Sequence, residues 1–372
     1  MKQETIESER CMIMEKKYKI LVTGACGVTS RSVVRSLNRS AYFKDQCEFI
    51  GTDVCYNLYG IYEGLYSRVY QVPAYHAPNY REAIQEIIDA HDIEYAIIIP
   101  EPEALYWSKN PFPVKFFRIP PKFGRAVLSK LHLYELLQGT GLTPDFQLVN
   151  KKEILESANS VKLSYPMWIR DYSEGTTSGM GSFAPDNYEE LKAWLCINKK
   201  VDTFMLSEFL PGRNLACFLM YDNGKLLKYG VAQRIDYLMA KVAVSGITGN
   251  TSRGKLLNDE NVFDVARNAV EYVASTTGET MNGLVVVDLK ENADGKPMVT
   301  EINLRHVAFT STFANAGFNF SEYQMLLLSG QKDLIPDELT MQFPENNIML
   351  RDVDGLPIYL SDFEGIPYSV MG

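Results

Sequence analysis

Short apolar runs alternate with helical patterns along the first third of the chain. The run YKILVT at residues 18–23 ends at two glycines and is followed by apolar residues at helical spacing. Two similar runs, at residues 48–53 and 95–100, enclose an amphipathic helix that begins at Asn79. Strands that alternate with helices imply a parallel sheet with both faces covered. The pattern therefore predicts an α/β domain over residues 1–120.

A boundary is expected near residue 120, where three prolines lie close together. Beyond it the pattern becomes that of an α+β domain over residues 121–330. The expected elements are, in order, a helix at 127–137, a strand at 167–170, a glycine-rich loop at 175–181, a helix from residue 187 and a strand at 203–210. Residues 150–207 would then form a small subdomain, or lid, of the larger domain.

Two hairpins are expected in the rest of this domain. They turn at Asn223-Gly224 and at Asp294-Gly295, because these residue pairs favour two-residue type I′ turns. A helix lies between them. Residues 331–372 carry four prolines and are expected to wrap around the body. The predicted architecture is α/β overall, with a parallel-sheet domain followed by a two-lobed α+β domain.

Composition narrows the choice of function. The 372 residues are 46% hydrophobic and 22% charged, which is typical of a globular protein with two or three packed units. A net charge of −9 argues against nucleic acid or an anionic membrane as a partner. The first residues are too charged for a signal peptide, and the six cysteines show no CxxC pair, so we expect a cytoplasmic protein. The four histidines show no zinc-hydrolase spacing.

The second hairpin carries the strongest candidate chemistry. If Asp294 and Gly295 form a two-residue turn, Asp288 lies directly opposite Glu301, and like charges at such positions repel. Strand alternation places Glu301, Asn303 and Arg305 on one face, together with Val299, while Thr300, Ile302 and Leu304 face the other way. A hard cation such as Mg²⁺ would convert the repulsion into coordination, and Arg305 would hold an anion. The alternative is a solvated hairpin face.

A second candidate is the strand that ends at Arg170 and continues into the loop with Gly175, Gly179 and Gly181. Such a loop can direct backbone N–H groups at phosphate oxygens while the arginine supplies charge. The alternative is a mobile surface loop. The apolar strand that ends with Glu208 and Leu210 could accept a purine along its main chain, or it could simply be a buried strand.

The glycine turn after the first strand supports a different class of function. Gly24 and Gly27 resemble a dinucleotide fingerprint, with Asp53 as the ribose-binding acid, which would suit an NAD(P)-dependent nucleotide-sugar oxidoreductase or epimerase. Such enzymes also need a Tyr-x-x-x-Lys pair on a helix. Tyr221 and Lys225 have this spacing but span the first hairpin turn, which weakens the interpretation.

Taken in order, these elements resemble the ATP-grasp superfamily, and most closely one synthetase half of the carbamoyl-phosphate synthetase large subunit, over about residues 19–330. Lys130 precedes Gly-Leu-Thr-Pro at residues 141–144, which is similar to the family's Gly-Ile-x-x-Pro motif. Arg170 matches the carbamoyl-phosphate synthetase branch. The resemblance implies that the first domain is a Rossmann-like pre-ATP-grasp domain, whose glycine turn faces the acceptor substrate and binds no NAD.

The resemblance also implies roles for single residues. It assigns nucleotide contacts to Lys130, Arg170, Gly175, Gly179, Glu208, Leu210 and, at the ribose, Asn214. It assigns the magnesium or manganese ligands to Asp288, Glu301 and Asn303, and it gives Asn303 and Arg305 catalytic roles. The sequence departs from the family where Leu304 replaces a proline, Asp171 replaces a proline, and Asn214 replaces a glutamate that commonly binds ribose.

The function implied by this resemblance is that of an ATP-dependent carboxylate–amine ligase. A carboxylate attacks the γ-phosphate of Mg-ATP to give an acyl phosphate, which an amine then displaces. The expected partners are small-molecule carboxylate and amine substrates, with neither nucleic acid nor membrane, and a homodimer stays open. Besides the oxidoreductase or epimerase, the alternative is an ATP-binding member without catalysis.

Overall fold

The N-terminal domain contains the predicted parallel sheet. The computed structural model describes residues 18–55, 59–171, 182–242, 246, 250–307, 309–352 and 368–370. The sheet has the strand order β14-β3-β2-β1-β4, and all neighbouring strands are parallel. Its strands are β1 (Tyr18–Thr23), β2 (Cys47–Asp53), β3 (Arg68–Gln71), β4 (Tyr95–Ile97) and β14 (Tyr368–Val370).

Alternation along β1 decides which helices cover which face of this sheet. Ile20 and Val22 pack in the same core as buried residues of α1 (Val28–Leu37). Leu21 points to the opposite face, where it packs with residues of α2 (Tyr80–Ala90) and α3 (Glu101–Lys109). Because both faces are buried, the strand is apolar along nearly its whole length.

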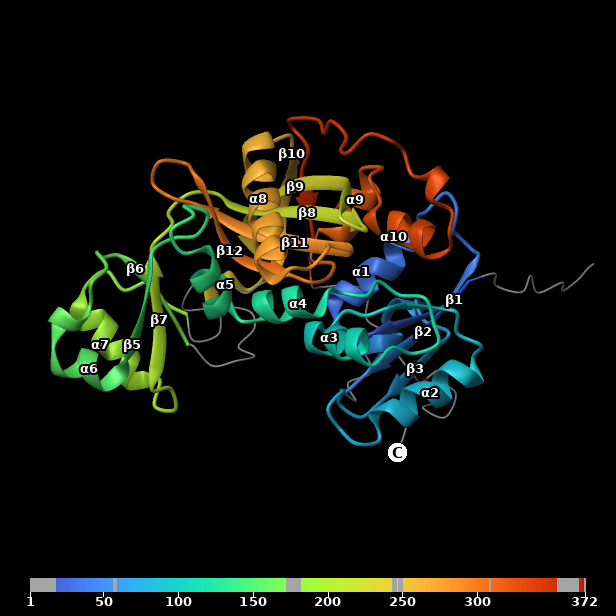
Figure 1. The fold of residues 1–372 in the computed structure, drawn as a ribbon, viewed down its shortest axis with the longest axis horizontal. Coiled ribbons are helices and arrows are strands. Elements are labelled where there is room, and N and C mark those ends of the chain that lie inside the picture. The colour runs from blue at the N-terminus through green and yellow to red at the C-terminus, as the bar shows by residue number, and fades with distance from the viewer. Residues whose placement is uncertain are drawn as a thin grey trace, which may run out of the picture.

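A six-stranded antiparallel sheet forms the centre of the molecule (Figure 1). Helix α8 (Glu260–Thr277) covers one face, and α9 (Thr310–Asn315) with α10 (Phe320–Leu328) covers the other. The strands, in the order β12-β11-β8-β9-β10-β13, are β12 (Pro297–Asn303), β11 (Gly283–Glu291), β8 (Asn214–Asp222), β9 (Lys225–Tyr237), β10 (Thr251–Leu257) and β13 (Met349–Leu350). The turn at Asn223-Gly224 joins β8 and β9 as predicted, with both residues at positive φ.

A three-stranded antiparallel sheet extends to one side of the molecule, away from the N-terminal domain (Figure 1). Its strands are β5 (Phe146–Asn150), β7 (Thr203–Glu208) and β6 (Met167–Asp171). Helices α6 (Lys151–Glu156) and α7 (Tyr188–Ile197) pack against it and give it a separate core that includes Ile154 and Leu191. A short helix, η2 (Ala158–Ser160), follows α6.

The helix predicted at 127–137 is in fact divided between two helices, α4 (Pro121–Leu128) and α5 (Lys130–Leu137). Ser129 between them is extended, and its hydroxyl accepts a hydrogen bond from the backbone N–H of His132. Serine favours this N-cap conformation over the interior of a helix, which explains the break. As a consequence, Lys130 becomes the first residue of α5.

The C-terminal residues contribute a strand to each of the two larger sheets. Strand β13 pairs with β10, and β14 lies at the edge of the N-terminal sheet beside β3. Between α10 and β13, η4 (Lys332–Leu334) begins an extended segment that covers the buried Lys228, whose ammonium donates to the carbonyls of Pro336 and Glu338. Across the described part of the chain, no helix has the length and apolar character needed to cross a membrane.

Candidate active site

The acidic pair predicted on the second hairpin is present. Asp288 on β11 is the direct partner of Glu301 on β12. Both side chains are partly exposed, at 22% and 34%, so a ligand could reach them from solvent. Because two carboxylates at such a position repel, the pair requires compensating positive charge.

The turn of this hairpin differs from the two-residue turn that was expected. Asn292 donates its backbone N–H to the carbonyl of Lys296 at 3.0 Å, which leaves a three-residue turn at 293–295 with Gly295 at φ +77°. A bulge at Thr300 then shifts the register by one residue. The two differences cancel, which is why the pairing of the two carboxylates still agrees with the prediction.

The bulge does change one predicted position. Val299 was expected on the same face as Glu301 and Asn303, and this is wrong. It packs in the core with Ile302 and Leu304, because the extra residue at the bulge reverses the alternation before that point. The polar face of β12 therefore begins only at Glu301.

Two cations compensate the acidic pair. Lys130 Nζ donates to Glu301 Oε1 at 2.8 Å, and Arg234 Nη2 donates to Asp288 Oδ1 at 2.7 Å. Lys130 can reach the hairpin because α5 lies between the two antiparallel sheets. Tyr134 of α5 packs on the three-stranded sheet (the smaller sheet), while other α5 residues belong to the core of the six-stranded sheet (the larger sheet).

The charges around the pair shift its two carboxyl groups in opposite directions. Burial alone would raise the pKa of Glu301, but Lys130, Arg170 and Arg305 together lower it below the ordinary value. Burial and the neighbouring Glu301 raise the pKa of Asp288, although its own ion pair opposes the change. Glu301 is therefore the more firmly ionised member of the pair.

Arg234 was not predicted from the sequence, and it also contacts Asn214. Its Nη1 donates to Asn214 Oδ1 at 3.3 Å and to the backbone carbonyl of Leu215 at 3.0 Å. The amide nitrogen of Asn214 donates to the Tyr237 hydroxyl. Both ends of this amide are thus engaged within the protein, at a position where the resemblance implies a ribose contact. The register of the hairpin β8–β9, which pairs Asn214 with Arg234, is the signal that could have identified the arginine.

The N-terminal domain reaches the same hairpin through Glu101, a second residue that sequence analysis missed. Glu101 begins α3, and its Oε1 accepts a hydrogen bond from the backbone N–H of Leu304 at 2.7 Å. Burial raises the pKa of Glu101, and the neighbouring Arg305 opposes the shift. The Arg305 guanidinium donates to the carbonyl of His306 at 3.0 Å. The signal for Glu101 is its place directly after the apolar run at residues 95–100, which contains β4.

The remaining predicted nucleotide residues lie on the smaller sheet. Arg170 on β6 is close enough to Glu301 to lower its pKa, and within the described residues its buried Nε has no hydrogen-bond partner. Glu208 ends β7 and is exposed, whereas Leu210 just beyond it is buried. The predicted phosphate-loop residues, Gly175 and Gly179, lie outside the described residues.

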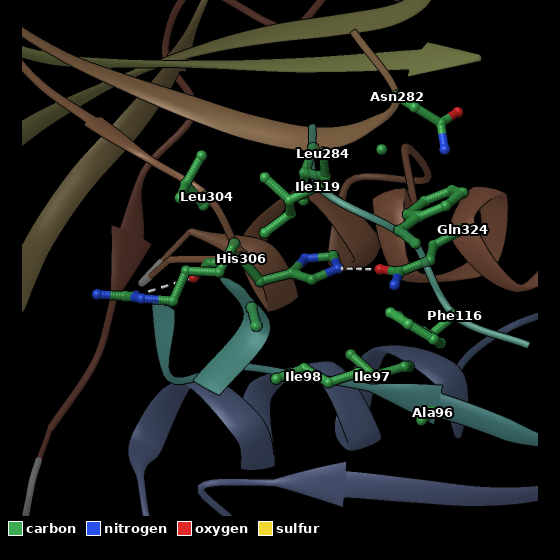
Figure 2. A pocket seen from close by; sticks show the side chains of 14 residues that line it. Ala96, Ile97, Ile98, Phe116, Ile119, Asn282, Leu284, Leu304, His306 and Gln324 are labelled. Carbon is green, nitrogen blue, oxygen red and sulfur yellow. Dashed lines mark hydrogen bonds between the residues drawn. The ribbon is translucent and has the colours of Figure 1, made fainter. Parts of the chain in front are cut away.

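A small cavity lies beside the end of β12, where the N-terminal domain meets the six-stranded sheet (Figure 2). It encloses about 30 Å³, which is room for water and not for a nucleotide. Figure 2 shows His306 directed toward Gln324, and the two side chains are hydrogen-bonded at 2.7 Å. Burial lowers the pKa of His306 to about 4, so the imidazole is neutral at pH 7.

A parallel-sheet domain followed by two antiparallel sheets is the arrangement of the ATP-grasp fold, and solved structures of ligases share this fold with the chain. An L-amino acid ligase from Bacillus licheniformis is 14% identical with a TM-score of 0.60, over 87% of this chain and 78% of that one. An N5-carboxyaminoimidazole synthetase from Staphylococcus aureus, complexed with ADP, is 13% identical with a TM-score of 0.62, over 91% and 81%. A D-alanine–D-alanine ligase from Bacillus anthracis is 15% identical with a TM-score of 0.53, over 85% and 97%. No protein-family model and no curated protein matches the sequence.

The hairpin residues fit a magnesium or manganese ion only if a ligand supplies further donors. Asp288 and Glu301 offer carboxylate oxygens, and the amide nitrogen of Asn303 bonds the carbonyl of Val286 at 3.4 Å, which leaves its oxygen as a third donor. Within the described residues, no three His, Cys, Asp or Glu side chains gather as a metal site. Phosphate oxygens are the usual additional donors for Mg²⁺, so the set suits a metal–nucleotide complex.

Proposed function

We propose that the protein is an ATP-dependent ligase that joins a carboxylate to an amine, with release of ADP and phosphate. One observation carries the proposal: Asp288, Glu301, Asn303 and the cation Lys130 converge on one face of β12, at the junction of the two antiparallel sheets. The fold is shared with ligases, one of which is complexed with ADP.

In this proposal the nucleotide lies between the two sheets. Lys130 and Arg170 bind its phosphates, because both cations approach Glu301 from the side of the smaller sheet. Glu208 and Leu210 lie at the end of β7, beside the adenine, and Gly175 and Gly179 belong to the loop proposed to cover the phosphates. Asp288, Glu301 and Asn303 would hold Mg²⁺ or Mn²⁺, which neutralises phosphate charge when bound.

The reaction is then a phosphoryl transfer followed by acyl transfer. The substrate carboxylate takes the γ-phosphoryl group, ADP leaves, and the amine displaces phosphate from the acyl phosphate. In this proposal Arg305 stabilises charge on the acyl phosphate, which is supported by the hydrogen bond that orients its guanidinium toward the carbonyl of His306. Glu101 orients the backbone just before Arg305 through Leu304.

The alternative of an NAD(P)-dependent enzyme is less well supported by the contacts of Asp53. Both of its carboxylate oxygens accept backbone N–H groups, from Cys26 at 3.0 Å and from Cys55 at 2.9 Å. The side chain therefore holds the Gly24–Gly27 turn in place. Titration with Mg-ATP and with NADPH separates the two classes of function, since only the ligase should bind the first.

An ADP-release assay tests the proposed function directly. Pairs of carboxylic acids and amines, beginning with amino acids and amino sugars, are screened with Mg-ATP. Stimulated ADP release with formation of an amide supports the ligase. ATP binding without hydrolysis for any pair would instead favour a binding protein. That alternative is considered because the side-chain amide of Asn214, at the position of the ribose contact, is hydrogen-bonded to other residues of the protein.

A further inference from the structure

Three arginines gather beside α1, away from the hairpin. Arg31 and Arg35 lie one turn apart on α1, and both contact Glu63 of η1 (Tyr59–Gly64). Arg35 Nε donates to the carboxylate at 2.7 Å, whereas Arg31 Nη1 lies 3.6 Å from it. Arg351 follows β13 and is close enough to Arg35 for their charges to interact. Glu63 is thus shared by the two arginines of α1.

Several polar atoms of the cluster are buried without a hydrogen-bond partner among the described residues. They are Arg31 Nε, Arg351 Nε, Arg351 Nη2 and the hydroxyl of Tyr66, a side chain that is 4% exposed and lies near Arg31. Buried donors without acceptors are uncommon and costly. A bound group with several acceptor oxygens and negative charge would satisfy both the donors and the excess of positive charge.

The position of the cluster suits a substrate. Helix α1 begins directly after the glycine turn that ends β1, and η1 follows β2, so the contact between Arg31 and Glu63 joins two elements that begin at the carboxyl edge of the parallel sheet, where α/β domains bind ligands. Figure 1 shows α1 between the N-terminal sheet and the helices of the six-stranded sheet. Glu101, which contacts Leu304 beside Arg305, belongs to the same edge.

We propose that Arg31 and Arg351, supported by Arg35, bind an acidic group, either a carboxylate or a phosphate, carried by the acceptor substrate in addition to the group that reacts. This inference rests on the proposed function in one respect only, namely that the anion belongs to an acceptor substrate of the ligase. The binding of an anion by this cluster does not depend on it. The substrate class is therefore an acid with two anionic groups or a phosphorylated acid or amine.

Calorimetric titration of the full chain with inorganic phosphate and with succinate, without nucleotide or metal, tests the anion site. At least one of the two should bind saturably, and the better probe tells whether the site prefers phosphate or carboxylate. Arg351→Met and Arg31→Met should each weaken this binding by about tenfold or more, because each removes charge-assisted hydrogen bonds. Arg351→Lys should weaken it less, since the charge stays. The matched control is Arg253→Met, whose side chain is about half exposed and pairs with Asp236.

Three results would overturn the proposal. The first is that neither probe binds saturably. The second is that binding is unchanged in folded Arg351→Met, Arg351→Lys and Arg31→Met proteins. The third is binding that Lys130→Met abolishes but the arginine variants retain, which would place the anion at the nucleotide site. Mg-ATP affinity is measured on the same samples: arginine-dependent phosphate binding without any ATP binding would refute the ligase while leaving the anion site in place.

Discussion

Asp288 and Glu301 face each other across β11 and β12, and each is neutralised by a cation from a different part of the chain. Arg234 comes from β9, which β8 separates from β11 in the sheet, and Lys130 comes from the first turn of α5. A metal–nucleotide complex would add positive charge and phosphate at this point. The two ion pairs therefore stabilise the site before the nucleotide binds, and the predictions below follow from them.

Glu301→Gln should slow ADP release strongly with little effect on stability. The change relieves repulsion with Asp288, worth a few tenths to about 1 kcal/mol, but it also removes a partly exposed ion pair with Lys130, of similar worth. The rate should fall by about 10²–10³, the usual cost of losing one charge-stabilising group. Turnover and urea unfolding are measured on the same sample. An unaltered rate of ADP release would remove the metal assignment.

Lys130→Met should weaken Mg-ATP binding by roughly 10–100-fold, because a hydrogen bond between charged groups contributes about 1.5–3 kcal/mol. Calorimetry with a non-hydrolysable analogue measures the change. Lys152→Met is the matched control, since Lys152 is exposed on α6 and pairs across one helical turn with Glu156. Equal affinity in the Lys130 variant and the control would contradict the phosphate-binding role.

The hairpin shows how far sequence patterns lead in this chain. Local alternation and an assumed two-residue turn at the Asp-Gly pair predicted that Asp288 lies opposite Glu301, and it does. They could not predict the three-residue turn or the bulge at Thr300, because each is a local distortion that depends on packing. The agreement is real, but it arises from two differences of one residue that cancel.

Arg234 and Glu101 could not be predicted for another reason. Each acts on a residue more than fifty positions away, Asp288 in one case and Leu304 in the other. Sequence spacing carries information about neighbours on one helix or hairpin, and it carries little about contacts made by the packing of separate elements. The ATP-grasp fold itself was predictable because it depends on the order of elements, and the order is a property of the chain.

The stability of the protein should decrease between about pH 6.5 and pH 4 because of His306. Burial holds the pKa of this histidine at about 4, against 6.5 as its ordinary value. In that interval the unfolded chain binds a proton that the folded protein does not, so stability is lost as the pH falls. This difference in pKa between the folded and the unfolded state corresponds to a loss of roughly 3 kcal/mol of stability, which is complete once the pH is below both pKa values.

Urea unfolding at several pH values, on the native protein and on His306→Gln, isolates this contribution from that of the carboxylates. Glutamine can still hydrogen-bond but does not titrate in this range. The native protein should lose more stability than the variant between pH 6.5 and pH 4. Parallel pH profiles would show that the imidazole of His306 is accessible to protons in the folded state.

Arg234→Met should destabilise the metal-free protein, and Mg²⁺ with an ATP analogue should restore part of the loss. The Arg234 side chain is 9% exposed, and its removal leaves Asp288 without its ion-pair partner while Glu301 still faces it. The cost should lie between the roughly 1 kcal/mol of an exposed pair and the about 3–5 kcal/mol of a fully buried one, because Asp288 is 22% exposed. A divalent ion held between the two carboxylates would replace the missing charge, so the variant should gain more stability from the metal–nucleotide complex than the native protein does.

Arg253→Met, in an exposed pair with Asp236, should cost less than about 1 kcal/mol and show no such rescue. Unfolding is followed in urea with and without the ligands, and equal stabilisation of native and Arg234→Met proteins would mean that the ion does not bind between Asp288 and Glu301.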